Sequence, residues 1–415
     1  MNIGPRRVVI TGMGAVTPVG HTVAESGESI LAGKSGFANN SYQVDISDMP
    51  IGGVCEVKEW DGAEKVGRKE SRRMDRCQQF VHVATAEAMA QSGLKVTDEN
   101  RERIGVYMGT GVGGVQTLIG TEHVLQEKGH RRVSPFAITL IMPNGAAGMV
   151  AIEYGLQGPA MTTTTACAAG TDGIGNGFMA VRMGIVDAAV VGGTEAPVTR
   201  VTMASFAKAG ALSKRTEGTP SPFDKDRDGF VAAEGAGMLV IETLEHAKAR
   251  GANILGEIVG FGQTCDAYHI TAPDSNGTGA TRAIKNAIAM AGKSVTDVDY
   301  MNAHGTGTRL NDSIETTAIK QALGEHAYKV AVSSTKSMTG HGMGATGAIE
   351  TVFCALALRD QIIPPTISMV EADPECDLDY VSEGGARKAE LNLATNHAFG
   401  FGGHNAVLAL GRYTE

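Results

Sequence analysis

The sequence has 415 residues, 42% of them apolar and 20% charged, a balance typical of soluble globular proteins with a large core. The net charge of −9 argues against a general affinity for nucleic acid or for anionic membranes. Six dispersed cysteines with no Cys-x-x-Cys pair exclude the usual zinc motifs and fit a reducing compartment. With no signal-peptide pattern and no apolar run of about 20 residues, we expect a cytoplasmic protein without membrane insertion.

Short apolar strands alternate with helical patterns along the chain. The segments predicted as strands are 7–11, 104–108, 188–192, 237–242, 254–261, 298–302, 329–333 and 405–410. Helical periodicity is found in residues 75–93 and 281–291. Because the strands are apolar on both faces, the pattern predicts an α/β fold whose sheets are covered by helices.

Two segments far apart in the chain are similar. Residues 9–14 read Val-Ile-Thr-Gly-Met-Gly, and residues 258–262 read Ile-Val-Gly-Phe-Gly after a charged helical stretch. The similarity indicates a duplicated α/β unit. We therefore expect two similar halves, residues 1–253 and 254–415.

Cys167 lies where a β-favouring Thr run turns into a small-residue stretch that can begin a helix. The N–H groups and the dipole at a helix N-terminus favour a thiolate and lower the thiol pKa. They can also hold a developing oxyanion. A buried structural cysteine is the competing interpretation, and the other five cysteines are assigned to it.

Two histidines lie in glycine-rich loops of the second half. His304 follows a predicted strand in His-Gly-Thr-Gly-Thr, and His341 lies in Thr-Gly-His-Gly-Met-Gly. Such loops are where α/β proteins carry working side chains, although a histidine bonded to the backbone is the alternative. One cysteine with two such histidines indicates acyl transfer through a thioester.

Other ligand sites receive little support from the motifs. The two histidines have no second ligand at helical or hairpin spacing, so no metal site is expected. Residues 109–114 are rich in glycine but lack the Gly-Lys-Ser/Thr ending of a phosphate-binding loop, so nucleotide binding is not expected either. We expect no cofactor.

Seven motifs in order along the chain resemble the condensing enzymes of fatty acid synthesis, the β-ketoacyl synthases of the thiolase superfamily. They are Val-Val-Ile-Thr-Gly-Met-Gly at 8–14, Thr-Ala-Cys at 165–167, Pro-Phe-Asp at 222–224, Glu-Gly-Ala-Gly at 234–237, His-Gly-Thr-Gly-Thr at 304–308, Lys336 with Gly-His at 340–341, and Phe-Gly-Phe-Gly-Gly at 399–403. The resemblance covers nearly the whole chain.

The resemblance implies a thiolase-like fold, with two similar halves in five α-β-α-β-α layers and a homodimer. It implies that Cys167 takes an acyl group from acyl carrier protein and that the backbone N–H groups of Cys167 and Phe401 hold the oxyanion. His304 and His341 would then stabilise the enolate formed as malonyl-carrier protein loses carbon dioxide. Neutral imidazoles suit this role because they donate hydrogen bonds without giving up a proton.

The resemblance also assigns roles around this centre. Lys336 would act near the second histidine with support from Glu350, and Phe401 would gate the site. The residues implied to contact substrate are Thr306, Thr308, Val112, Phe206, Thr271 and Phe399. Val112 falls where long-chain members have a β-branched residue, which favours a type II synthase over a type I synthase. Ala233 and His404 depart from the family pattern.

A basic patch is formed by Arg68, Lys69 and Arg72, and a second pair is Arg131 and Arg132. Such runs are usually solvated helix faces. Against an acidic carrier protein they would speed and orient docking, so we assign them to the carrier interface.

Three alternatives stay open. A type I synthase or a polyketide ketosynthase would share the same site residues. A coenzyme A thiolase would carry a second cysteine near the C-terminus, and residues 399–405 contain none. A non-catalytic chain-length factor would lack the nucleophile, which Cys167 argues against.

Overall fold

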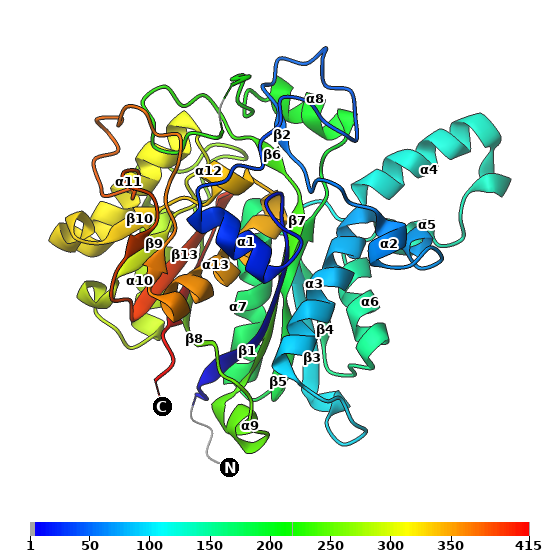
Figure 1. Ribbon diagram of the computed structural model, residues 1–415, viewed down its shortest axis with the longest axis horizontal. Helices are drawn as coiled ribbons and strands as arrows, with labels where there is room; N and C mark the ends of the chain where they lie inside the picture. Colours follow the sequence, from blue (N-terminus) through cyan, green and yellow to red (C-terminus); the bar gives the residue numbers. More distant parts are fainter. Residues whose placement is uncertain (1–4, 218, 415) are drawn as a thin grey trace.

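The computed structural model describes residues 5–217 and 219–414, which form a ten-stranded mixed sheet with helices on its faces (Figure 1). The first five strands across it come from the N-terminal half: β4 (Ala160–Thr163), β3 (Ile104–Gly109), β5 (Ala188–Glu195), β7 (Gly235–Thr243) and β1 (Val8–Val16). The other five come from the C-terminal half: β8 (Gly256–Cys265), β14 (His404–Gly411), β13 (Leu393–Gly400), β9 (Tyr300–Asn302) and β10 (Ala331–Ser333).

The two halves have the same topology. In the first, β1 pairs antiparallel with β7, β7 antiparallel with β5, and β5, β3 and β4 are parallel. In the second, β8 pairs antiparallel with β14, β14 antiparallel with β13, and β13, β9 and β10 are parallel. The halves meet where residues 8–10 of β1 pair antiparallel with residues 256–258 of β8. The predicted duplication therefore extends to every strand of the main sheet.

Helices cover the outer faces of the two halves and also lie between them. On the outer faces, α3 (Arg76–Ser92) packs on β1 and β7, and α10 (Thr278–Met290) packs on β8 and β14. Between the halves lie α7 (Ala169–Arg182) and α13 (Thr346–Asp360), which contact each other and strands of both halves (Figure 1). Nearly all of α13 is buried, as expected for a helix that is apolar on all sides. This arrangement is the thiolase-like α/β fold that the sequence predicts.

The remaining elements lie outside the ten-stranded sheet, and some of them, including all four residues of α12, are buried. Their bounds are α1 (Val23–Leu31), β2 (Val54–Cys55), α2 (Gly62–Lys65), α4 (Val115–Lys128), α5 (Ala137–Ile141), α6 (Gly145–Tyr154), α8 (Arg200–Lys208), β6 (Ala232–Ala233), α9 (Leu244–Ala249), α11 (Arg309–Leu323), α12 (Lys336–Thr339), β11 (Ile362–Ile363) and β12 (Arg387–Lys388). Within the described ranges, no helix is both long and apolar enough to cross a membrane.

Local sequence explains where the outer helices sit. Asp75 caps α3 in a capping box with Gln78, and Gly93 ends the helix in the left-handed conformation. The motif strands β1 and β8 carry alternate glycines on the face that meets a helix. A Cβ atom at Gly14 would lie 1.8 Å from the carbonyl oxygen of Ala84 in α3, and one at Gly262 would lie 2.0 Å from that of Ala283 in α10. The repeated glycines thus allow the same close helix-on-strand contact in both halves.

Gly14→Ala tests this contact. The added methyl group must push α3 away from β1, and overpacking of this kind typically costs about 1–3 kcal/mol of unfolding free energy. Denaturant unfolding monitored by circular dichroism measures the loss.

Gly148→Ala in α6 is the matched control, because a Cβ atom there meets nothing within 4 Å. Alanine in a helix interior should raise the unfolding free energy by about 0.5–1 kcal/mol. If Gly14→Ala is as stable as the unaltered chain, the glycine does not set the spacing between α3 and β1.

Candidate functional site

Cys167 lies at the junction between β4 and the central helix α7. A short 3-10 turn, Ala166–Ala168, connects them, and Ala166 adopts a left-handed φ of 50°. That conformation is unfavourable for a residue with a Cβ atom, costing roughly 1–2 kcal/mol. The turn presents Cys167 at a cavity, where its side chain keeps part of its surface exposed.

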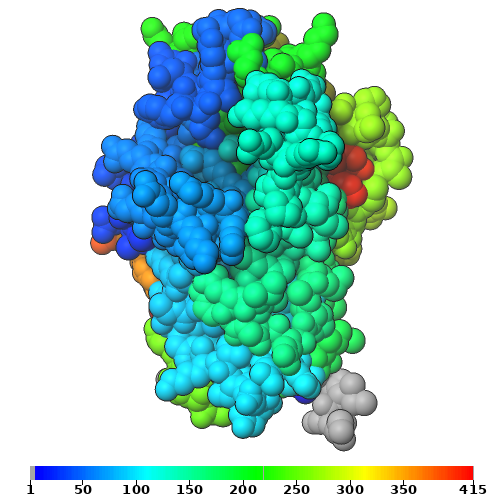
Figure 2. Space-filling model, turned by 90° about the vertical axis from the view of Figure 1, so that its right-hand side faces the viewer, coloured from blue at the N-terminus to red at the C-terminus, as the bar shows by residue number. Residues whose placement is uncertain are grey.

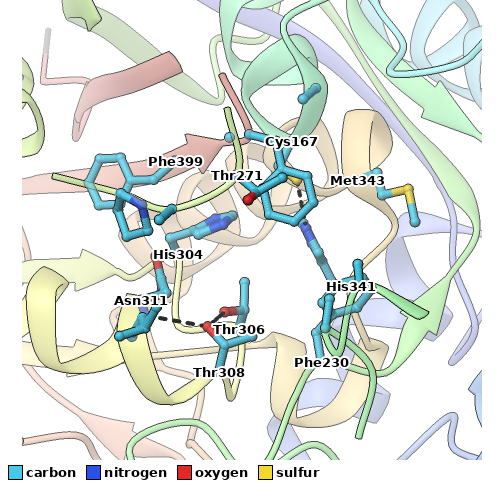
Figure 3. A pocket seen from close by; sticks show the side chains of 18 of the residues that line it. Cys167, Phe230, Thr271, His304, Thr306, Thr308, Asn311, His341, Met343 and Phe399 are labelled. Atoms are coloured by element: carbon cyan, nitrogen blue, oxygen red, sulfur yellow. Dashed lines mark hydrogen bonds between the residues drawn. The ribbon is translucent and has the colours of Figure 1, made fainter. Parts of the chain in front are cut away.

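His341 lies at the equivalent junction of the second half, just before α13. Its backbone is fixed by two hydrogen bonds, since its N–H donates to Val231 O at 2.7 Å and its carbonyl accepts from Ala233 N at 3.0 Å. Its Nε2 atom is 3.0 Å from the Cys167 sulfur (Figure 3). On the other side of the ring, Nδ1 faces the Thr346 hydroxyl at 3.4 Å.

His304 follows β9 and reaches the same cavity. The backbone N–H groups of His304 and Gly305 donate to the two carboxylate oxygens of Glu315 at 2.7 and 2.8 Å. The ring of His304 stands perpendicular to that of His341, with centroids 5.3 Å apart. Figure 3 shows both imidazoles directed toward Cys167 from the opposite wall.

The cavity has a volume of about 440 Å³ and is lined by residues of both halves. It brings together most of the residues singled out from the sequence: Cys167, His304, His341, Thr306, Thr308, Val112, Phe206, Thr271, Phe399 and Phe401. Thr306 and Thr308 share a hydroxyl–hydroxyl hydrogen bond of 3.0 Å. Phe206 and Phe401 lie against each other with ring centroids 6.4 Å apart.

The other predicted residues lie outside the cavity lining. Lys336 and Glu350 are fully buried and form an ion pair of 2.7 Å behind the histidines. Arg68, Lys69, Arg72, Arg131 and Arg132 are exposed. The two segments that carry these residues lie close together: Arg73 follows Arg72 in the first, Phe136 belongs to the second, and the Arg73 guanidinium is 5.0 Å from the centroid of the Phe136 ring. Figure 2 shows the corresponding blue and teal segments on one face of the molecule.

Burial controls the protonation of the three central groups. It lowers the pKa of His304 and of His341 well below the usual value, and the charge of Lys336 lowers both further. Both imidazoles are therefore neutral at pH 7. Burial also raises the pKa of the Cys167 thiol to about 11, although Lys336 and the backbone N–H groups of Phe401 and Cys167 act in the opposite direction. The expectation of a lowered thiol pKa is wrong, because loss of hydration outweighs the helix N-terminus.

The arrangement can perform acyl transfer on a sulfur nucleophile. The backbone N–H groups of Phe401 and Cys167 lower the pKa of the thiol, so both favour negative charge on the sulfur. Two neutral imidazoles on the opposite wall can donate to a substrate oxygen. In the described part of the chain, no group of three or more His, Cys, Asp or Glu side chains is placed to hold a metal ion.

Several residues of the site were not found from the sequence. Phe230 packs edge-on against His341 at 5.2 Å, and Met343 lines the cavity. Glu315, which holds the His304 backbone, also lies 3.2 Å from a third buried histidine, His397. His397 is four residues before Phe401, so its place beside a recognised motif was an available signal. No local pattern marks Glu315, which lies inside helix α11.

Comparisons with known proteins agree with this site. Residues 5–247 match the model of the β-ketoacyl synthase N-terminal domain, and residues 255–370 match that of the C-terminal domain. The chain is 47% identical over 415 residues to 3-oxoacyl-[acyl-carrier-protein] synthase 2 of Synechocystis sp., covering 99% of both chains. It is 47% identical over 410 residues to the synthase of the same name from Staphylococcus aureus strain N315, covering 98% of this chain and 99% of that one.

Solved structures give the same result. The ishigamide ketosynthase/chain length factor superposes with a TM-score of 0.91 at 37% identity, covering 99% of this chain and 100% of that one. A type II polyketide ketosynthase in complex with its acyl-carrier protein, AntDE:AntF, has a TM-score of 0.87 at 34% identity with the same coverage. The chain therefore belongs to the β-ketoacyl synthase family of acyl-transferring condensing enzymes.

Proposed function

We propose that this chain is the condensing enzyme of fatty acid elongation, joining malonyl units to an acyl group held as a thioester on Cys167. The observation that carries the proposal is the 3.0 Å contact between Cys167 Sγ and His341 Nε2, with His304 across the same cavity. The 47% identity to 3-oxoacyl-[acyl-carrier-protein] synthase 2 over nearly the full length supports the substrates.

The first step is transfer of the acyl group to Cys167. The sulfur attacks the thioester carbonyl of the acyl-carrier protein, a new carbon–sulfur bond forms, and the carrier sulfur leaves with the proton of the thiol. Because the thiol pKa is about 11, the developing thiolate needs donors. His341 Nε2–H supplies one when the Thr346 hydroxyl donates to Nδ1, and the N–H groups of Cys167 and Phe401 hold the oxyanion.

The second step uses the histidines on malonyl-carrier protein. Carbon dioxide leaves, and the electron pair moves into an enolate whose oxygen accepts hydrogen bonds from His304 and His341. Their lowered pKa keeps them neutral, so they stabilise the enolate without protonating its carbon. That carbon then attacks the carbonyl carbon of the Cys167 thioester, the carbon–sulfur bond breaks, and the sulfur leaves as a thiolate that takes a proton from water. The product is a 3-oxoacyl thioester longer by two carbons.

The surrounding residues complete the proposal. Lys336, paired with Glu350, acts through its charge on both histidines and on Cys167 and does not line the cavity. Thr306 and Thr308 meet the carrier's pantetheine arm. Val112, Phe206, Thr271 and Phe399 contact substrate, and Phe401 gates the site.

A polyketide ketosynthase is the second candidate, because solved ketosynthases of that kind superpose closely. Their identity of 34–37% is below the 47% to the fatty acid synthases, which favours the latter. The type II assignment rests on Val112 at the cavity wall. A non-catalytic chain-length factor is disfavoured by the intact site. The length and reduction state of products formed from malonyl-carrier protein separate the candidates.

The same proposal includes the organisation of the chain. We assign residues 1–253 and 254–415 to the two halves, a division supported by the end of α9 at Ala249 and the start of β8 at Gly256. A cytoplasmic location is supported by the six unpaired thiols, which are typical of reducing compartments.

Cys167→Gln tests the reaction. Without sulfur the variant cannot hold the acyl group, so condensation should fall to background while decarboxylation of malonyl-carrier protein persists, since His304 and His341 remain. Product chromatography and release of labelled carbon dioxide measure the two activities. Cys376→Ser is the control, because that thiol is buried near α11 and does not line the cavity. Condensation by Cys167→Gln would remove Cys167 as the nucleophile.

Carrier docking is proposed at Arg68, Lys69, Arg72, Arg131 and Arg132. Reversing Arg68, Lys69 and Arg72 to Glu should raise KM for acyl-carrier protein and weaken its dependence on salt, because an exposed basic patch steers an acidic partner. Turnover of a small acyl thioester should not change. Lys285→Glu with Lys293→Glu is the control, as both residues are exposed, Lys285 within α10 and Lys293 just after it. An unchanged KM for the carrier after the triple reversal excludes this patch from the interface.

Self-association is proposed at the face that carries β4, supporting a homodimer. Strand β4 is one of the two edge strands of the ten-stranded sheet, α6 contacts both β4 and α5, and α5 contacts α4 (Figure 2). An open edge beside apolar side chains is a surface that is usually covered. The exposed apolar residues of these elements include Leu118, Leu125, Ile138, Ile152 and Met161.

Met161→Asp should weaken the association, because β4 would then place a charge in the interface. Light scattering should show dimers for the unaltered chain and a concentration-dependent shift to monomers for the variant. Met183→Asp, equally exposed but next to the end of α7, should leave the dimer intact. A monomeric unaltered chain at micromolar concentration contradicts the proposal.

A further inference from the structure

Glu195 is a buried carboxylate that the proposed reaction does not use. It is the last residue of β5 and is fully buried. Oε1 accepts hydrogen bonds from the Thr110 hydroxyl at 2.9 Å and from Val112 N at 3.1 Å. Oε2 accepts from Gly111 N at 2.5 Å and from Gly344 N at 3.1 Å. The Glu195 side chain therefore accepts four hydrogen bonds from two loops that lie far apart in the sequence.

The two loops form opposite parts of the cavity wall. Gly111 and Val112 line the cavity in the N-terminal half. Gly344 belongs to the C-terminal half, where it follows the cavity residue Met343 in the turn that leads from His341 into α13. Glu195 thus ties the wall at Val112 to the turn that carries His341.

The contact is built for a carboxylate. In the described part of the chain, no basic side chain lies within ion-pairing distance of Glu195, so its hydrogen bonds must offset the cost of burial. A Cβ atom at Gly111 would lie 2.8 Å from Glu195 Oε2, and one at Gly344 would lie 2.7 Å from it. Both backbone segments therefore need glycine to approach the carboxylate this closely.

We propose that Glu195 is a positioning residue that sets the distance between the acyl-pocket wall at Gly111 and Val112 and the turn carrying His341 and Met343. It acts through these residues and does not touch the reacting atoms. The inference deepens the proposed function and rests on it, because the pocket is taken to hold the acyl chain. Long acyl chains, which contact more of the wall, should depend on Glu195 more than short ones.

The charge of Glu195 gives an independent signal. A negative charge there raises the pKa of the Cys167 thiol, and it acts on the buried thiol of Cys77 in the same direction. Burial raises the pKa of Glu195 itself to about 7, while its four donors act in the opposite direction. Removing the charge should therefore lower the pKa of Cys167, so that the thiol reacts faster at a given alkaline pH.

Two variants separate position from charge. In Glu195→Gln the amide NH₂ group cannot accept, so at least one of the three backbone N–H groups loses its partner whichever way the amide turns. Glu195→Asp keeps the charge but is shorter by one methylene group and cannot reach both loops. Glu257→Gln is the matched control, since Glu257 is also buried on a strand but bonds to Arg7 at the far end of β8.

The test compares kcat/KM for a long-chain and a short-chain acyl-carrier protein. Both Glu195 variants should lose long-chain activity relative to short-chain activity, on the order of 100-fold for a displaced pocket wall. The pH profile of Cys167 alkylation by iodoacetamide, followed by mass spectrometry, should move to lower pH in Glu195→Gln and stay in place in Glu195→Asp. Glu257→Gln should match the unaltered chain in both measurements.

The outcomes distinguish the positioning role of Glu195 from the proposed function. Failure of the unaltered chain to condense any acyl donor overturns the proposed function. Condensation by the unaltered chain, with both Glu195 variants keeping its ratio of long-chain to short-chain activity, overturns the positioning role. Equal losses for both donors, with only a lower melting temperature and no shift in the alkylation profile, also overturn it, because they show general destabilisation.

Discussion

The site depends on the contact between the first turns of the two central helices. Gly170 at the start of α7 lies so close to α13 that a Cβ atom there would be 2.5 Å from Gly344 O and 3.0 Å from Ala348 N. Each helix is entered through a residue with left-handed φ, Ala166 at 50° and Met343 at 45°. Because the two junctions occupy equivalent positions in the duplicated fold, this single contact brings Cys167 and His341 together from opposite halves.

Burial then decides the chemistry that the contact allows. The cavity keeps both imidazoles neutral and the thiol protonated, and Lys336 is the nearby charge that acts on all three. An ion pair as deeply buried as Lys336 with Glu350 is weak evidence for stability, because desolvation offsets most of its attraction. In this fold the charge of Lys336 lowers the pKa of the Cys167 thiol and of both histidines, which favours a thiolate and disfavours an imidazolium. Both effects suit a sulfur nucleophile served by uncharged donors.

Much of this was predictable from the sequence, for a physical reason. Strand and helix patterns reflect burial, and the paired segments at residues 9–14 and 258–262 carry alternate glycines because a helix lies on each strand. Cys167, His304 and His341 stand in motifs that are local in the chain. Glu195 and Glu315 do not lie in such motifs. Each accepts hydrogen bonds from backbone N–H groups of other segments, and nothing in the sequence distinguishes it from any other acidic residue. The thiol pKa was predicted in the wrong direction because a helix N-terminus is visible in sequence, whereas the loss of hydration around the sulfur is not.

The duplication also explains which half of the chain supplies each group of the cavity. The first half supplies the sulfur and the wall at Val112, and the second supplies both histidines and the threonines of the His304 loop. A cavity between two units would open and close with any movement between them, so contacts that join the two halves limit that movement. Phe401 crosses from the second half to the sulfur of the first, and Glu195 crosses from the first half to Gly344 of the second. Both contacts join the part of the cavity wall that carries Cys167 and Val112 to the part that carries His341.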